Sequence, residues 1–146
     1  LPLDGVLARP RGVFVTLSRD GALRGCIGSL DGRLPLAEAV LESGRNAAVA
    51  DPRFPPVAPD ELGSLDLEVS VLSPLVPVAG PDGIEVGRHG VVLGKGDRRA
   101  VFLPQVAPQN GWDRDTMLTQ LALKADLPPD AWRRGASFAV FTADVF

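Results

Sequence analysis

The chain has 146 residues, a length that predicts one domain over residues 1–146, and a formal net charge of −3. Its single cysteine excludes an internal disulfide bond and is typical of a reducing, cytoplasmic compartment. No apolar run approaches the ~20 residues that span a bilayer, so no membrane association is expected. The arginines are scattered rather than gathered in a basic stripe, so the sequence lacks a strong sign of nucleic-acid binding.

The first half of the chain predicts a β-hairpin followed by a helix and a further strand. Asp20-Gly21 is a strong hairpin turn because glycine tolerates positive φ, and Pro35 suits the first turn of a helix. That helix is expected to end before Pro52, since the residue preceding a proline avoids α geometry. The predicted elements are strands over 12–17 and 22–27, a helix over 34–50, one helical turn over 59–62 and a strand over 66–72.

The second half predicts a similar order of elements, with a helix that begins after Asp113. Aspartate is a good N-cap, and the residues after it place Met117, Leu118 and Leu121 on one apolar side. The predicted elements are a short strand over 84–86, hairpin strands over 91–93 and 100–102, a loop leading to Trp112, the helix, and a final strand over 137–146.

The two halves share a pattern in which a hairpin is followed by a loop, a helix, a proline-rich segment and a strand. Residue identities between the halves are weak, so the repeat is inferred from the order of elements. We expect an α+β fold in which two related hairpin–helix–strand halves pack as one compact domain with a cleft. The alternative is one irregular sheet without a true repeat.

Cys26 stands out as a candidate for chemistry. Alternate side chains of a strand share a face, so Cys26 is in phase with Arg24 rather than with Ile27. Gly25 and Gly28 flank it, and glycine within a strand often marks close approach by a ligand or another backbone. A neighbouring cation favours the reactive thiolate. The alternative is a buried cysteine that packs as a small hydrophobic residue.

A few further residues extend this candidate site. His89, the single histidine, could act as general base for a Cys26 nucleophile. Glu68 alternates away from its apolar neighbours, so it could orient the histidine, pair with Arg24 or be an exposed strand glutamate. Arg53 and Trp112 are loop residues of types enriched at binding sites. An exposed turn histidine and a packed tryptophan are the plainer alternatives. One cysteine and one histidine cannot form a structural zinc set, and no phosphate-binding loop occurs, so no metal or cofactor is expected.

Long motifs run in order through nearly the whole chain. They span residues 10–17 (PRGVFVTL), 23–28 (LRGCIG), 51–56 (DPRFPP), 67–73 (LEVSVLS), 88–90 (RHG), 103–108 (LPQVAP), 111–113 (GWD) and 127–132 (LPPDAW). Together they resemble the AMMECR domain family, which includes protein A of the AmmeMemoRadiSam system. Arg88 is a mild departure, because the family often has lysine there.

This resemblance implies an α+β fold of two internally related halves and a functional centre at residues 23–28, hereafter the hexapeptide. Family members usually carry a further N-terminal helix, which we expect to be missing from this chain. The AmmeMemoRadiSam grouping implies a Memo-like protein and a radical SAM protein as candidate partners. The catalytic candidates are Cys26, His89 and Glu68, and the ligand-binding candidates are Arg24, Gly25, Gly28, Arg53, Gln105 and Trp112.

Three functions remain open at this level. The preferred one is a catalytic or substrate-binding component of a protein or RNA modification system, centred on the hexapeptide. The second is a non-enzymatic adaptor or ligand-binding module for a protein partner. The third is an RNA-handling module that uses arginines, namely Arg24, Arg53, Arg98 and Arg99.

Overall fold

The computed structural model describes residues 5–146 and has an α+β fold, as the sequence predicts. The described chain divides into two compact units: unit 1 comprises residues 5–74 with Asp144–Phe146, and unit 2 comprises Leu75–Ala143. Each unit has a four-stranded sheet and its own hydrophobic core.

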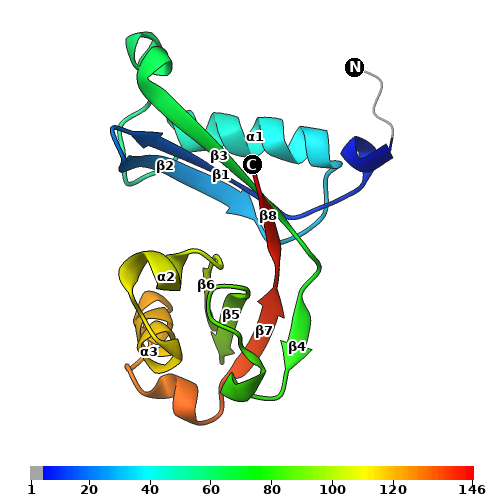
Figure 1. Ribbon diagram of the computed structural model, residues 1–146, viewed down its shortest axis with the longest axis vertical. Helices are drawn as coiled ribbons and strands as arrows, with labels where there is room; N and C mark the ends of the chain where they lie inside the picture. Colours follow the sequence, from blue (N-terminus) through cyan, green and yellow to red (C-terminus); the bar gives the residue numbers. More distant parts are fainter. Residues whose placement is uncertain (1–4) are drawn as a thin grey trace. The chain divides into compact units, whose positions relative to one another are not determined.

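Unit 1 is built on a tight hairpin. Its elements are β1 (Val13–Arg19), β2 (Ala22–Ser29), α1 (Leu36–Val49), β3 (Leu65–Leu72) and β8 (Ala143–Val145), with 3-10 helices at Gly5–Ala8 and Pro59–Ser64. Between β1 and β2, Asp20 and Gly21 have φ values of 52° and 78°, a left-handed pair that matches the twist of the flanking strands. The sheet order is β2-β1-β3-β8, and α1 lies along one face of the sheet (Figure 1).

The core of unit 1 lies between α1 and the sheet. Val13, Val15 and Leu17 alternate along β1 and are all buried, together with Leu36 and Ala47 of α1. Burying each large aliphatic side chain contributes about 1.5–3 kcal/mol. This core fixes which face of β1, and therefore of its neighbours, is turned toward α1.

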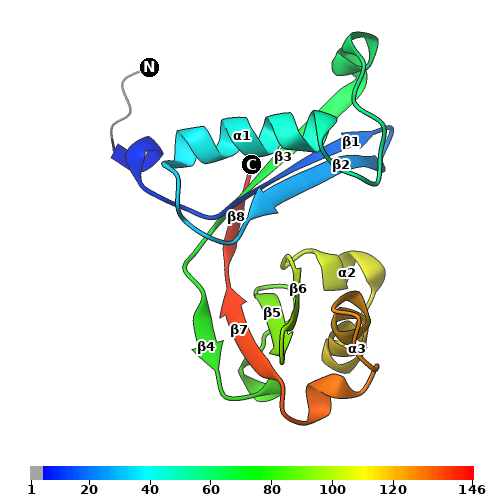
Figure 2. The ribbon, with the colours of Figure 1, turned by 180° about the vertical axis from the view of Figure 1, so that it is seen from behind.

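Unit 2 contains β4 (Val76–Val78), β5 (Gly90–Lys95), β6 (Arg98–Phe102), α2 (Val106–Asn110), α3 (Arg114–Lys124) and β7 (Ser137–Phe141). Its sheet order is β4-β7-β5-β6, and Figure 2 shows α3 beside the β5–β6 end. The predicted N-cap is confirmed, because Asp113 Oδ1 accepts the Thr116 N–H at 2.8 Å. Met117, Leu118 and Leu121 of α3 are buried in the core, as the apolar pattern predicts.

The predicted hairpin–helix–strand repeat is confirmed by the two sheet orders. In unit 1 the first hairpin strand is central, with order β2-β1-β3, and in unit 2 the order β6-β5-β7 is the same. The fourth strand of each sheet directly follows, in the sequence, the last strand of the other sheet's hairpin–helix–strand repeat. β4 follows β3 but pairs with β7, and β8 follows β7 but joins β3, where Val69 and Phe146 exchange two backbone hydrogen bonds.

Three local predictions differ from the structure. The strand over 84–86 is wrong, because the Ile84 N–H closes a 3-10 turn onto Pro81 and the side chain is buried. The strand over 137–146 divides at Thr142 into β7 and β8, which belong to different sheets. The loop before Trp112 contains α2, whose five residues are too few to show a helical period. The cleft between the halves stays a prediction.

Candidate functional site

The hexapeptide lies on β2, which is the edge strand of the unit 1 sheet. Ile27 packs against the core beneath α1. A Cβ on Gly25 would overlap the backbone carbonyl oxygen of Ala47 in α1. Gly25 therefore permits the close approach of strand and helix, and both residues occupy the face predicted for them.

Cys26 lies on the opposite face, in one row with Thr16 and Glu68. The strand register pairs Cys26 with Thr16 on β1, and Thr16 with Glu68 on β3. The Cys26 Sγ and Thr16 Oγ1 atoms are 3.3 Å apart, and either can be the donor. The row thus places a thiol, a hydroxyl and a carboxylate next to one another, and Cys26 is partly exposed.

The backbone of Cys26 is held by two residues of the loop after α1. Its N–H donates to Asp51 Oδ2 at 3.0 Å, and its carbonyl accepts from Arg53 Nη2 at 3.4 Å. Arg53 in turn binds the carboxylate of Asp51 through Nε at 3.0 Å and Nη2 at 2.7 Å. This Asp51–Arg53 clamp covers the edge of β2, where the unpaired backbone would otherwise face solvent.

The two side chains of the clamp differ strongly in solvent exposure. The Asp51 side chain is only 2% exposed, whereas that of Arg53 is 56% exposed. Hydrogen bonds from the Arg53 side chain hold the pKa of Asp51 well below its usual range against the opposing effect of burial, and the backbone N–H groups of Cys26 and Arg53 lower it further. The same pairing raises the pKa of Arg53. Both groups are therefore charged at neutral pH.

Arg24 is engaged by a second carboxylate, that of Glu61. Arg24 Nε and Nη2 each lie 3.1 Å from a Glu61 oxygen, a bidentate geometry, and Nη1 donates to the Pro55 carbonyl at 2.8 Å. Hydrogen bonds from Arg24, and then from the Ala58 N–H, lower the pKa of Glu61 to about 2. Because Glu61 binds Arg24 in this bidentate geometry and also accepts from Arg19 at 3.1 Å, Arg24 anchors the strand rather than standing free as the cation predicted beside Cys26.

Beyond the clamp, Gly28 leaves the edge of β2 open. Antiparallel residue pairs alternate between exchanging backbone hydrogen bonds and not doing so, and Cys26 is of the second kind because its N–H goes to Asp51. Gly28, opposite Phe14, is two residues further along and is therefore of the same kind. The N–H and carbonyl of Gly28 therefore point away from β1. In the described chain, neither group makes a backbone hydrogen bond on that outer side of β2.

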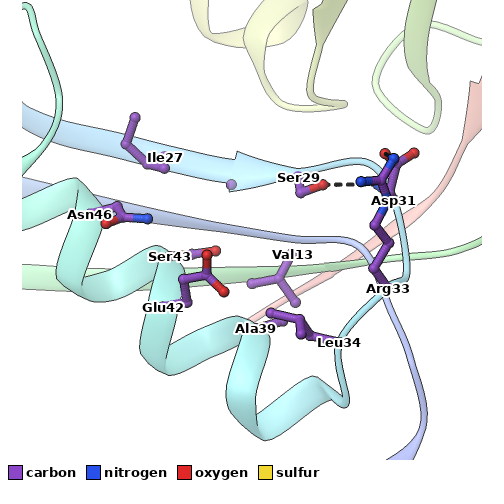
Figure 3. Close-up of a pocket in the computed structure, with 11 residues that line it drawn as sticks. Val13, Ile27, Ser29, Asp31, Arg33, Leu34, Ala39, Glu42, Ser43 and Asn46 are labelled. Atoms are coloured by element: carbon purple, nitrogen blue, oxygen red, sulfur yellow. Dashed lines mark hydrogen bonds and ion pairs between the residues drawn. The ribbon is translucent and has the colours of Figure 1, made fainter.

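A pocket of about 370 Å³ adjoins Gly28, between the end of β2 and α1 (Figure 3). The helix contributes Glu42, Ser43 and Asn46 to its lining, and Figure 3 shows the last two reaching from α1 toward β2. Within residues 5–146 no hydrogen bond engages the side-chain amide of Asn46. Cys26 does not line this pocket. The thiol of the hexapeptide therefore lies outside the pocket that its last residues line.

The comparisons with known proteins identify the family. The family described as AMMECR1 matches residues 2–146. The chain belongs to the AMMECR1 family. A relative from Methanosarcina acetivorans is 43% identical over 149 residues, covering 99% of this chain and 75% of that protein. Another from Thermococcus gammatolerans is 47% identical, covering 92% and 71%.

A solved structure agrees with the AMMECR1 fold described above. The crystal structure of the uncharacterized protein PH0010 from Pyrococcus horikoshii is similar with a TM-score of 0.92 and 42% sequence identity. The match covers 96% of this chain and 74% of that one. The relatives thus support the fold and the family.

The remaining candidate residues of this AMMECR1 chain lie in unit 2, whereas Cys26 and Glu68 lie in unit 1. His89 closes a turn: its Nδ1 accepts the Glu85 N–H at 2.9 Å, and its own N–H donates to the Glu85 carbonyl. This hydrogen bond uses Nδ1 as an acceptor within the turn. The role of His89 as a base stays a prediction.

Trp112 and Gln105 flank the short helix α2. The Trp112 ring packs on the unit 2 core, with its centroid 5.7 Å from that of Phe102. Gln105 stands at the N-cap of α2, where its carbonyl accepts the Gln109 N–H at 3.1 Å. Both residues have a structural role in unit 2, and their binding roles stay predictions.

Sequence reasoning missed the residues that organise the hexapeptide. Asp51 had a local signal, since a carboxylate two residues before Arg53 lies within a motif already noted. The contact of Glu61 with Arg24 had none, because the two residues are far apart in the sequence, and no local pattern marks Asn46 as a pocket residue. Among residues 5–146, no group of three or more His, Cys, Asp or Glu side chains is placed to hold a metal ion. In the same part of the chain, no helix has the length and apolar character to cross a membrane.

Proposed function

We propose that this AMMECR1-family chain is the substrate-binding component of a protein or RNA modification system and that its substrate docks at the hexapeptide. The observation that carries the proposal is the pocket of about 370 Å³ beside the open backbone of Gly28. Binding sites are typically concave, with a few convergent polar groups. Here those groups are the Gly28 backbone and the side chains of Ser43 and Asn46.

Rigidity of the hexapeptide supports a binding role. The Asp51–Arg53 clamp holds Cys26, and Glu61 holds Arg24 through a bidentate pair. A strand fixed at both positions presents Gly28 without having to order itself on binding, which reduces the entropic cost of association. The candidate partners implied by the family resemblance, a Memo-like protein and a radical SAM protein, belong to the same proposal.

A fragment screen by two-dimensional NMR of the ¹⁵N-labelled chain tests this binding role. Ligands should shift the amide signals of Gly28, Ser29 and Asn46 together. Asn46→Ala should weaken the best fragments about fivefold, the equivalent of one hydrogen bond. Arg45→Ala, on the same helix but outside the pocket, should leave them unchanged. Fragments that bind only elsewhere, or equally well to Asn46→Ala, would reject the proposal.

A second candidate function is covalent catalysis by Cys26, favoured by the row it forms with Thr16 and Glu68. A hydroxyl that donates to sulfur stabilises a thiolate, the nucleophilic form. Removing it in Thr16→Val should slow alkylation of Cys26 by iodoacetamide about fivefold at neutral pH, as followed by mass spectrometry. Ser18→Ala, two residues along β1, is the matched control. An unchanged alkylation rate in Thr16→Val would show that the thiol is not activated by its neighbour.

A further inference from the structure

The open backbone at Gly28 has the geometry that an added β-strand requires. A residue of an extended peptide placed opposite Gly28 would exchange two backbone hydrogen bonds with it, as in a hydrogen-bonded antiparallel pair. At Cys26 the same positions are already filled by Asp51 and Arg53. Pairing is therefore confined to the Gly28 end of β2, which sets the register of the added segment.

The pleat of that added strand directs particular side chains into the pocket. A peptide residue directly opposite Gly28 would share its face, which is turned away from α1. Because side chains alternate, the residue on either side of it would point toward α1 and the pocket beside Glu42 and Asn46. Backbone pairing and the pocket would thus be used by adjacent residues of the same segment.

Charge in the pocket favours a cationic side chain. Asp31 and Arg33 line it and form an ion pair of 3.2 Å, so their charges offset one another. Glu42 is exposed and has no ion-pair partner in the described chain. One uncompensated carboxylate therefore remains, with the amide of Asn46 as an additional acceptor.

We propose that the ligand of this site is an extended segment of a protein, paired with Gly28 and carrying a lysine or arginine that reaches Glu42. This inference rests on the proposed substrate-binding function and narrows its substrate to protein. RNA is the poorer fit, because the only arginine lining the pocket is paired and the remaining carboxylate repels phosphate.

Blocked pentapeptides test the inference on the full chain by NMR titration. The parent probe is acetyl-Thr-Val-Lys-Val-Thr-amide. It belongs to a library of three pools, in which the central residue is lysine, arginine or glutamate and every other position is varied. Lysine and arginine pools should bind and shift Gly28 and Asn46, whereas glutamate pools should bind at least fivefold more weakly. N-methylation should weaken binding only at the peptide residue opposite Gly28, next to the central residue, because Asp51 and Arg53 block pairing at Cys26.

Variants of Glu42 test the charge contact. Glu42→Gln should weaken lysine peptides about fivefold, and Glu42→Lys should reverse the preference toward glutamate peptides. Glu38→Gln removes an exposed charge from the same helix outside the pocket and should have no effect.

The outcomes separate this inference from the proposed function. If fragments bind at Gly28 and Asn46 but no peptide pool does, the peptide inference is wrong and the binding function stands. Binding of a uridine decamer that displaces the fragments, with no peptide binding, would overturn it in favour of RNA. If neither fragments nor peptides bind at these residues, both proposals fail.

Discussion

Replacing Gly25 by alanine is expected to lower the free energy of unfolding by about 3 kcal/mol, the upper range for overpacking a core. The added Cβ would overlap the backbone carbonyl of Ala47, and neither group can move without separating β2 from α1. Urea denaturation of the variant should show a midpoint well below that of the parent chain.

Two glycine controls make this result specific. Gly44 lies within α1, and a Cβ there would meet only Val15 Cγ1, at 3.9 Å. Gly44→Ala should therefore stabilise the chain by about 0.5–1 kcal/mol through helix propensity. At Gly63 a Cβ would meet nothing within 4 Å, so Gly63→Ala should change little. A Gly25→Ala variant as stable as Gly63→Ala would contradict the close packing of strand and helix.

Asp51→Asn is expected to cost about 1–3 kcal/mol at neutral pH, because it removes a buried acceptor of charge-assisted hydrogen bonds. The amide group of asparagine would direct N–H donors toward the donors of Cys26 and Arg53. Loss of the clamp should also expose the edge of β2 at Cys26, which faster exchange of the Cys26 amide hydrogen would reveal.

The pH dependence of stability provides an independent test of Asp51. Its folded-state pKa lies below the ordinary value of 3.8, so its contribution is complete above that value and is lost as the pH falls below it. Glu61 behaves alike, losing its contribution between its ordinary 4.5 and about 2. Asp51→Asn should therefore lose less stability on acidification than the parent chain. Asp60→Asn, an exposed carboxylate of the same region, should keep the parent's profile.

Local sequence signals predicted most of the elements in both units. The turn at Asp20-Gly21, the N-cap at Asp113 and the alternation along β1 act over a few residues, so their physical meaning can be read from the chain directly. The repeat of hairpin, helix and strand followed from the order of those elements. Over residues 137–146 the assignment of sheet partners failed, since nothing local specifies that Thr142 separates two sheets.

The hexapeptide shows the same division at the level of the site. Alternation along the sequence was enough to place Cys26 and Ile27 on opposite faces, because side-chain direction in a strand depends only on position. The contacts of that strand depend on residues brought together by folding: Asp51 on the Cys26 backbone, Glu61 on Arg24, and Asn46 beside Gly28. Long-range pairing of this kind leaves no periodic trace in the chain, so the clamp and the pocket became visible only once α1 and its loop were packed against β2.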